Sequence, residues 1–405
     1  MTLDPPARLG RVEFIALVGM IYATVAFSID AMLPALPEIA LALTPERQTL
    51  ALLVVTSFVL GLGVGTLFTG PLSDSYGRKP VIFWGGVLYC SGAALAWQAQ
   101  SLDWLLAARV IQGLGAAGPR VVVTAIIRDL YKGREMAQIM SFAMLIFTLF
   151  PAVAPLIGAA IIWGFGWRSI FVAFLAFSLL SVGWLMLRQA ETLPGTARRP
   201  FRLSPLWQAM KEALALRQMQ LSILAQMMVF GCIFGAVSSV QGIFDQAYGM
   251  AASFPVWFAA MALLSAPAAP VNGMLVIRLG MRPLVRRAMA AQMTGSVIVA
   301  ALVITGLLGP SEVWVFAAWG VTVFALAGFS IGNLNALALE PLGHIAGMAA
   351  SIMGALATIG GAVIGSVIGQ LFDGTAVPLI LSCGVLSATG AVIMAFMPRE
   401  QVVSG

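Results

Sequence analysis

Long apolar stretches alternate with short polar breaks along the whole chain. Each stretch is about 20 residues or longer, which is enough for a helix to cross a bilayer core of roughly 30 Å. We expect α-helices, because a backbone in lipid must satisfy its own hydrogen bonds and because residues such as 51–55 do not alternate as barrel strands would. The twelve predicted spans are residues 12–34, 50–71, 81–99, 104–127, 138–162, 168–188, 219–244, 254–277, 284–308, 313–338, 347–371 and 376–397.

The longest polar break separates six predicted spans from six. It runs from residue 188 to 217, contains several prolines, and is predicted to form a short amphipathic helix over Leu206–Leu216. We therefore expect an N-terminal six-helix half over residues 1–188, a cytoplasmic linker over 189–217, and a C-terminal six-helix half over 218–405.

The composition excludes several other classes of protein. Apolar residues make up 60% of the chain and charged residues 9%, whereas a soluble domain is about half apolar and a quarter charged. The net charge of +6 does not indicate nucleic-acid binding, because the basic residues lie in short loops beside the apolar spans. The first span is too long for the apolar core of a cleavable signal peptide, so we expect it to be retained.

The basic residues also predict the orientation. With the N-terminus inside, 18 of the 22 Lys and Arg residues fall in stretches on the cytoplasmic side, and only Arg47 and Arg168 fall outside. Short loops rich in Lys and Arg stay in the cytoplasm. We expect a multi-pass protein of the plasma (inner) membrane with both termini in the cytoplasm. The remaining two, Arg109 and Arg120, lie within the fourth span.

A charged loop occurs twice. The sequence Gly70-Pro-Leu-Ser-Asp-Ser-Tyr-Gly-Arg-Lys-Pro80 is partly repeated by Gly273-Met-Leu-Val-Ile-Arg-Leu-Gly-Met-Arg-Pro283, at an offset of 203 residues in a chain of 405. The copy has Ile277 in place of Asp74 and Met281 in place of Arg78. The repeat predicts two parallel halves, with a substrate site between them near the middle of the membrane.

The first loop carries residue types suited to a latch between helix ends. Gly77 allows a turn with positive φ, and Asp74 can lie at a helix N-terminus. Arg78 and Lys79 can face acidic groups or lipid phosphates. We predict a cytoplasmic gate, to which Gly70 contributes a sharp helix exit; the alternative is an ordinary basic turn beside a span.

Three charged residues lie deep in the predicted spans. Asp30 is the only carboxylate clearly inside a span, and Arg109 lies about five residues into the fourth. A buried carboxyl group near an Arg can load and release a proton near neutral pH, since burial favours its neutral form and the cation its charged form. We predict that Asp30 and Arg109 couple transport to protons. For Asp30 the alternatives are a structural salt bridge and a hydrated acid at the outer helix end, and for Arg109 a side chain that reaches the outer interface.

Arg120 follows Pro119 in the middle of the fourth span, three turns from Arg109. Three interpretations stay open. Arg120 neutralises Asp30 in an internal ion pair or binds an anionic substrate; the remaining alternative is that it does neither.

The first loop resembles a known signature. Gly70-x-Leu-Ser-Asp74-x-x-Gly77-Arg78-Lys79 is similar to the loop between spans two and three of the major facilitator superfamily. The resemblance implies an acid at the cytoplasmic end of the fourth span as partner of the loop's Arg, and Asp129 fits that position. Ser75 departs from the family pattern, which usually has Arg there.

Further motifs resemble drug/proton antiporters of this superfamily, in particular the Bcr/CflA-like branch. Arg109-x-x-Gln-Gly113 is similar to a signature whose Arg is associated with proton coupling, and Asp30-x-x-x-Pro34 and Gly166-Trp-Arg-Ser-Ile-Phe171 fit the same branch. Pro155 and Gly158 match part of the antiporter motif G-x-x-x-G-P-x-x-G. Tyr22 stands where some related multidrug exporters have a second acid.

The second half carries no charged residue deep in a span. Gly361, Gly365 and Gly369 form a small-residue stripe that predicts helix packing. Aromatic and polar side chains in the spans either line a cavity or serve packing. The predicted substrate-binding residues of the whole chain are Tyr22, Arg120, Phe147, Phe230, Phe234 and Asn335.

The sequence thus predicts an all-α polytopic membrane protein with the major facilitator fold: twelve transmembrane helices in two pseudo-symmetric six-helix halves. We expect a proton-coupled transporter, functional as a monomer, that exports small, largely apolar compounds by alternating access. The alternative is a transporter of a small organic anion that uses Arg120 and Arg109 as ligands. No nucleotide-binding motif and no metal-ligand spacing occurs, so we expect no enzyme, no cofactor, no metal and no nucleic-acid partner.

Overall fold

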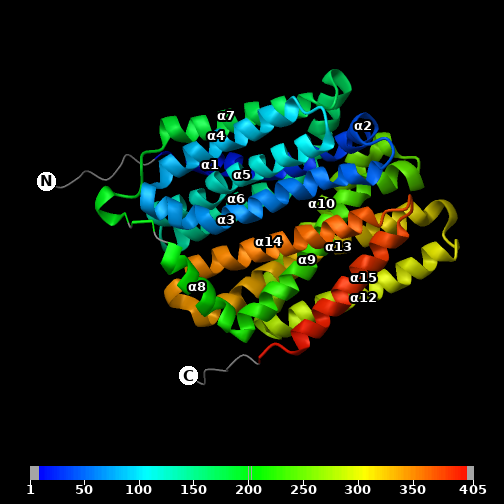
Figure 1. The fold of residues 1–405 in the computed structure, drawn as a ribbon. Helices are drawn as coiled ribbons and strands as arrows, with labels where there is room; N and C mark the ends of the chain where they lie inside the picture. The colour runs from blue at the N-terminus through cyan, green and yellow to red at the C-terminus, as the bar shows by residue number, and fades with distance from the viewer. Residues whose placement is uncertain (1–8, 199, 202, 399–405) are drawn as a thin grey trace. The chain divides into compact units, whose positions relative to one another are not determined.

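The computed structural model describes residues 9–198, 200–201 and 203–398, which form helices joined by short turns, with no strand among them (Figure 1). The helices of the first half are α1 (Arg11–Asp30), α2 (Leu36–Leu43), α3 (Leu53–Tyr76), α4 (Arg78–Trp97), α5 (Leu102–Leu130), α6 (Gly133–Phe165) and α7 (Ser169–Arg188). Those that follow are α8 (Leu203–Ala215), α9 (Arg217–Gly242), α10 (Phe254–Ser265), α11 (Ala268–Leu279), α12 (Met281–Ile304), α13 (Glu312–Leu339), α14 (Ala346–Gln370) and α15 (Val377–Ala395).

These helices account for the predicted spans. Ten stretches of the described residues are long and apolar enough to cross a membrane. One of them, Gly309–Gln370, contains both α13 and α14, and α6 holds a further apolar helix over Leu149–Phe165. With α13 and α14 taken separately and α6 added, the described part of the chain matches all twelve predicted spans, and the prediction of a polytopic all-α membrane protein is confirmed.

Two predicted spans are interrupted by prolines. In the first, α1 ends at Asp30 and is followed by a 3-10 helix over Leu33–Ala35 and then by α2. Each of these two new helices has a proline in its first turn. The eighth is divided into α10 and α11, and Pro267 precedes α11. Proline has no N–H to give to the preceding turn, so it begins a helix easily and interrupts one that is under way.

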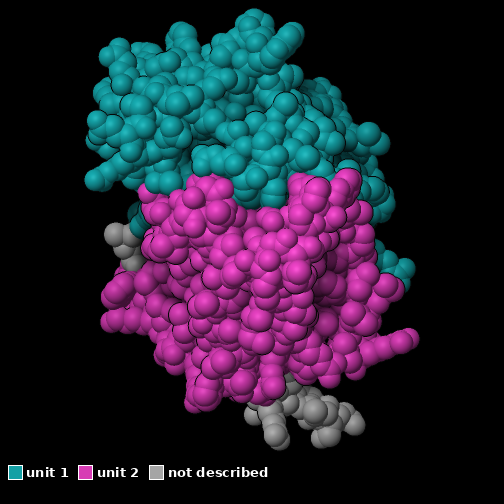
Figure 2. Space-filling model, turned by 90° about the vertical axis from the view of Figure 1, so that its right-hand side faces the viewer, with its two compact units in different colours: residues 1–203, 237–263 teal, residues 204–236, 264–405 magenta. Residues whose placement is uncertain are grey.

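The chain forms two compact units, which Figure 2 colours separately. The first contains residues 1–203 and 237–263, and the second contains residues 204–236 and 264–405. The boundary at residues 236 and 237 falls inside α9, and the boundary at residues 263 and 264 falls inside α10. The linker helix α8 lies close to its predicted position and contacts the segment between α13 and α14, where His344 Nε2 is 2.6 Å from Glu212 Oε1.

The two units repeat one order of helix packing. In the first, α5 packs on α3 and α4, while α4 packs on α7 and α1 on α6 and α7. In the second, α13 packs on α11 and α12, and α12 packs on α15. Gly361 of α14 faces Phe230 of α9, and Cys232 of α9 contacts Cys383 of α15. Each of these pairs in the first unit thus has a counterpart in the second, as the duplicated loop predicts.

The duplicated loops keep the same turn. Gly77 has φ 103° and ψ 163°, and Gly280 has φ 79° and ψ 158°. Glycine adopts positive φ without the clash that a Cβ brings. The helix that follows begins at the next residue in both cases, α4 at Arg78 and α12 at Met281.

Glycines let α3, α4 and α5 approach to backbone contact. A Cβ built on Gly113 would lie 2.0 Å from Phe58 O, and one on Gly61 would lie 2.1 Å from Val110 O. On the other side of α5, a Cβ on Gly115 would lie 2.2 Å from Tyr89 N. Small residues at helix contacts are the usual means of close packing in membranes.

We expect Gly113→Ala to lower the free energy of unfolding by about 1–3 kcal/mol, the usual cost of overpacking. Thermal unfolding of the purified protein in detergent measures the change. Gly183→Ala in α7 is the control, because nothing lies within 4 Å of its added Cβ. Equal melting temperatures for the two variants would contradict the close α3–α5 contact.

Candidate functional site

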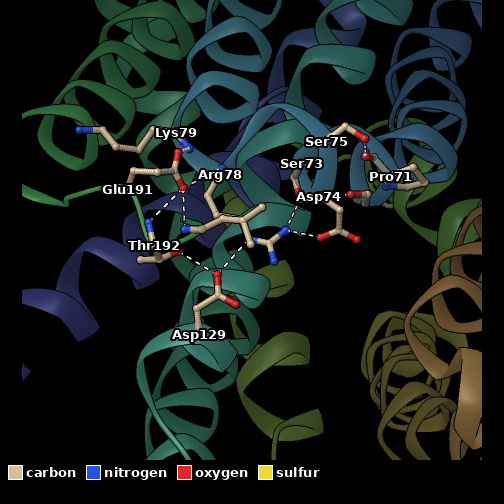
Figure 3. Close-up of polar contacts among 11 residues, drawn as sticks. Pro71, Ser73, Asp74, Ser75, Arg78, Lys79, Asp129, Glu191 and Thr192 are labelled. Carbon is tan, nitrogen blue, oxygen red and sulfur yellow. Dashed lines mark hydrogen bonds and ion pairs between the residues drawn. The ribbon is translucent and has the colours of Figure 1, made fainter. Parts of the chain in front are cut away.

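The structure brings Asp74, Arg78 and Asp129 together, and we call these three residues the latch (Figure 3). Arg78 NH1 lies 2.5 Å from Asp74 Oδ1, and Arg78 Nε lies 3.0 Å from Asp129 Oδ2. Arg78 NH1 also donates to Ser73 Oγ at 2.7 Å. The residues come from the end of α3, the start of α4 and the end of α5. Arg78 is 7% exposed, so its charge is held by partners rather than by water.

Lys79 does not join the latch. Its Nζ donates to Met186 O at 2.9 Å, in the last turn of α7. The corresponding residue of the second unit, Arg282, donates to Met394 O at 3.2 Å and to Ala395 O at 2.9 Å, at the end of α15. Cations are favourable near the free carbonyls of a helix C-terminus. The partial repeat of the loop, residues 273–283, therefore keeps this contact with a helix end but lacks the acid and the arginine of the latch.

Glu191, which the sequence reasoning missed, lies against the latch. Its carboxylate accepts from the backbone N–H groups of Arg78 and Lys79 at 3.0 Å each (Figure 3). Thr192 Oγ1 donates to Asp129 Oδ2 at 2.8 Å. One signal was present in the sequence. The predicted helix after Gly77 begins without a capping side chain, so its free N–H groups are available to water or to an acceptor from elsewhere in the chain.

Gly70 lies within α3, one residue before Pro71, and is half-buried. Gly77 is buried, and a Cβ there would lie 2.8 Å from Glu191 Oε2. Position 77 thus requires glycine both for its positive φ and for the approach of the Glu191 carboxylate.

Arg109 is fully buried, with 0% exposure. Its Nε donates to Val54 O at 3.1 Å, its NH2 to Ser28 O at 2.8 Å and its NH1 to Gln112 Oε1 at 2.7 Å. The guanidinium carbon lies 4.5 Å from the centre of the Phe58 ring. Arg109 therefore joins α1, α3 and α5. Among the described residues no carboxylate lies within ion-pairing distance of it.

Ser28 links this cluster to α4. Its hydroxyl donates to Thr24 O at 2.7 Å and lies 2.5 Å from Tyr89 OH. Because a serine has a single hydroxyl hydrogen, Tyr89 donates in the second bond. The end of α1 is thus held by Tyr89 through its side chain and by Arg109 through its carbonyl.

Asp30 is the last residue of α1 and is 6% exposed. Within the described part of the chain its carboxyl group has no ion pair or hydrogen bond, so it is not joined to Arg109 or Arg120 here. Helix α6 approaches closely beside it, since a Cβ on Gly158 would lie 2.1 Å from Ala31 O. The antiporter-like Gly158 therefore packs on the residue that follows the buried acid.

The predicted substrate-binding residues of the first half occupy different settings. Tyr22 is buried, and its OH lies 2.6 Å from Thr124 Oγ1 of α5. Arg120 is half-buried, without an ion pair to any described residue. Phe147 falls in α6, and its side chain lies outside the described part of the structure.

The candidates of the second half serve helix contacts at least in part. Phe230 and Phe234 stack with ring centres 5.5 Å apart. Their Cβ atoms face Gly361 and Gly365 of α14, as the small-residue stripe predicts. Asn335 is half-buried.

One polar pair of this half is satisfied internally. Asn333 Nδ2 donates to Asn272 Oδ1 at 2.7 Å, which joins α13 to α11. Across the described residues no group of three or more His, Cys, Asp or Glu side chains is arranged to hold a metal ion.

A helix arrangement that occurs twice, a charged loop at one helix end and charges buried in the first unit indicate a polytopic membrane transporter. The sequence comparisons agree: residues 18–365 match the model of the Major Facilitator Superfamily. The chain belongs to the major facilitator superfamily and is a transporter of small molecules, not an enzyme.

Proteins of known name are similar over almost the whole chain. A bicyclomycin resistance protein homolog of Haemophilus influenzae is 30% identical over 402 residues, which is 96% of this chain and 97% of that protein. A chloramphenicol resistance protein of Pseudomonas aeruginosa is 27% identical over 87% of this chain and 83% of that protein.

Solved structures share the fold. A crystal structure of a D-xylose–proton symporter superposes with a TM-score of 0.73 at 15% identity and covers 96% of this chain and 98% of that one. The human organic anion transporter MFSD10 superposes with a TM-score of 0.63 at 19% identity, over 96% of this chain and 100% of that chain. At these identities the likeness concerns the fold alone.

We expect Arg109→Lys to lower the free energy of unfolding by about 1–3 kcal/mol, because buried acceptors lose their donor. Lysine keeps the charge, but it lacks the planar fork that reaches Val54, Ser28 and Gln112 at once. Thermal unfolding in detergent measures the effect. The control is Arg168→Lys, at an exposed Arg whose NH2 donates to Ala99 O at 3.0 Å. Equal small shifts in the two variants would show that the buried fork is not needed.

Proposed function

We propose that this chain exports small, largely apolar compounds in exchange for protons, by alternating access across the inner membrane. The observation that carries the proposal is its likeness, over nearly its full length, to the bicyclomycin resistance protein homolog of Haemophilus influenzae. The bias of Lys and Arg toward one side supports an orientation with both termini in the cytoplasm. The chain acts as a monomer in this proposal.

Asp30 is proposed to carry the proton. An ionised carboxylate without a partner is costly in a low-dielectric interior, and taking up a proton removes that cost. Asp30 is buried and without an ion pair among the described residues, so its protonation state alone decides whether a net negative charge lies at the end of α1.

Arg109 is proposed to set the local field for this exchange. Its guanidinium donates to the carbonyl of Ser28, two residues before Asp30. A fixed cation favours release of the proton, and the apolar surroundings favour its uptake. The two effects oppose each other, which allows the acid to load and unload as access alternates.

The latch is proposed to hold the cytoplasmic ends of α3, α4 and α5 together. Arg78 bridges two carboxylates. The Asp74 side chain is 57% exposed and the Asp129 side chain is 23% exposed. Water can therefore compete for both acids when the helix ends separate, so the latch can break and re-form at modest cost.

We expect Asp30→Asn to reduce drug flux driven by a pH gradient at least about tenfold, since the group that carries the proton is gone. Flux is measured in proteoliposomes with a fluorescent substrate, and binding of the same substrate is measured separately. Asp103→Asn, at an exposed acid in the first turn of α5, is the matched control. Unimpaired flux in the Asp30→Asn variant would end the coupling proposal.

A second candidate function rests on Arg120. This half-buried cation has no ion pair to any described residue and so is open to a carboxylate of a small organic anion. Charge-assisted contacts of this kind are strong in a partly dehydrated site.

If the chain carries anions, Arg120→Gln reduces uptake or export of a labelled carboxylate by about tenfold or more, because the bound carboxylate loses a charge-assisted contact. The same variant leaves export of apolar drugs within about twofold. The two fluxes are compared in proteoliposomes, with Arg168→Gln as the control for loss of a positive charge. Loss of drug export with no carboxylate flux in the native protein would reject the anion carrier.

A further inference from the structure

The start of the linker folds back on the latch. After α7 ends at Arg188, the Glu191 carboxylate accepts four backbone hydrogen bonds, all at 3.0 Å. Two come from its own neighbours, Thr192 and Leu193. The other two come from Arg78 and Lys79, more than 110 residues earlier in the chain. One carboxylate thus ties the turn of the linker to the first turn of α4.

This carboxylate takes the place of a missing cap. The first N–H groups of a helix have no partner within the helix, and their positive end favours a negative charge. The residue before α4 is Gly77, whose lack of a side chain leaves these groups without a local acceptor. Glu191 supplies both the acceptor and the charge, and the absence of a Cβ at Gly77 makes room for it.

Thr192 reaches the latch itself. Its Oγ1 donates to Asp129 Oδ2 at 2.8 Å, and the same oxygen accepts from Arg78 Nε at 3.0 Å. The Asp129 carboxylate is therefore oriented by two donors, one on α4 and one on the linker (Figure 3). The linker thus holds the start of α4 through Glu191 and the end of α5 through Thr192, so moving these two helix ends apart strains one contact or the other.

We propose that Glu191 and Thr192 are positioning residues of the gate, and that the linker is released from α4 whenever the latch opens. Glu191 fixes the backbone from which the Arg78 side chain projects, and Thr192 fixes the acid that receives it. In this proposal the linker helps to position the latch residues, in addition to connecting the two halves of the chain. This inference rests on the proposed gating function.

The described residues of the second unit make a different contact at the repeated turn. There Arg282 donates to Met394 O and Ala395 O at the end of α15, whereas in the first unit a carboxylate and a hydroxyl of the linker contact the turn and the latch.

The first test is amide hydrogen exchange in the full chain, reconstituted in nanodiscs. The amides of Arg78 and Lys79 are followed in native protein, Glu191→Ala and Glu135→Ala. Glu135 is an exposed acid in the first turn of α6. The Glu135→Ala variant therefore shows the effect of removing a carboxylate near the start of a different helix. We expect exchange at Arg78 and Lys79 to rise about tenfold in Glu191→Ala and to stay at the native rate in Glu135→Ala. Native exchange in Glu191→Ala would overturn the cap.

The second test separates positioning from stability. Thr192→Val removes the hydroxyl at nearly constant shape, while Thr192→Ser keeps it. We expect turnover in Thr192→Val to change about threefold or more at an unchanged KM, since the gate lies away from the substrate. Thr192→Ser is expected to restore native turnover, and melting temperatures are measured alongside.

The outcomes distinguish this inference from the proposed function. Faster exchange in Glu191→Ala with native turnover in both Glu191→Ala and Thr192→Val would make the pair a structural cap only, and the positioning role would fail. If the native protein shows no proton-driven drug flux, the proposed function fails instead. The exchange experiment then still decides whether the linker is held at α4.

Discussion

The buried guanidinium of Arg109 is the interaction on which the first unit depends. A cation within a bilayer-spanning bundle is costly unless its donors are satisfied. Here the fork reaches the carbonyls of α1 and α3 and the side chain of Gln112, and one face covers the Phe58 ring. The satisfaction of one charge thus fixes how three helices meet, and it places Ser28 and the end of α1 next to it.

The use of carbonyls as partners explains what the sequence could and could not predict. The spans follow from apolar length and the lack of alternation, because a backbone in lipid satisfies its hydrogen bonds in helices or in closed barrels of alternating strands. The partners of Arg109 carry no sequence signal, since every residue has a carbonyl. The sequence therefore suggested a carboxylate, Asp30, as the partner, whereas the structure satisfies Arg109 with two carbonyls and Gln112 and leaves the Asp30 carboxyl group without an ion pair among the described residues.

The residues around the latch also differ in how well the sequence predicts them. Asp129 could be named from the family pattern, since the acid stands at a fixed place beside the fourth span. Glu191 stands in a polar linker without periodicity, and its partners are more than 110 residues away. Such a contact depends on tertiary folding. Pro267, which divides α10 from α11, was visible in the sequence, but the long apolar stretch around it obscured the interruption.

The glycine contacts of α5 have a consequence for how this molecule can diverge. Gly113 and Gly115 meet the backbones of α3 and α4 at distances that exclude any side chain, so these positions tolerate almost no substitution whatever the compound carried. Sequence divergence is therefore expected mainly at side chains away from these contacts, while the spacing of α3, α4 and α5 stays constant.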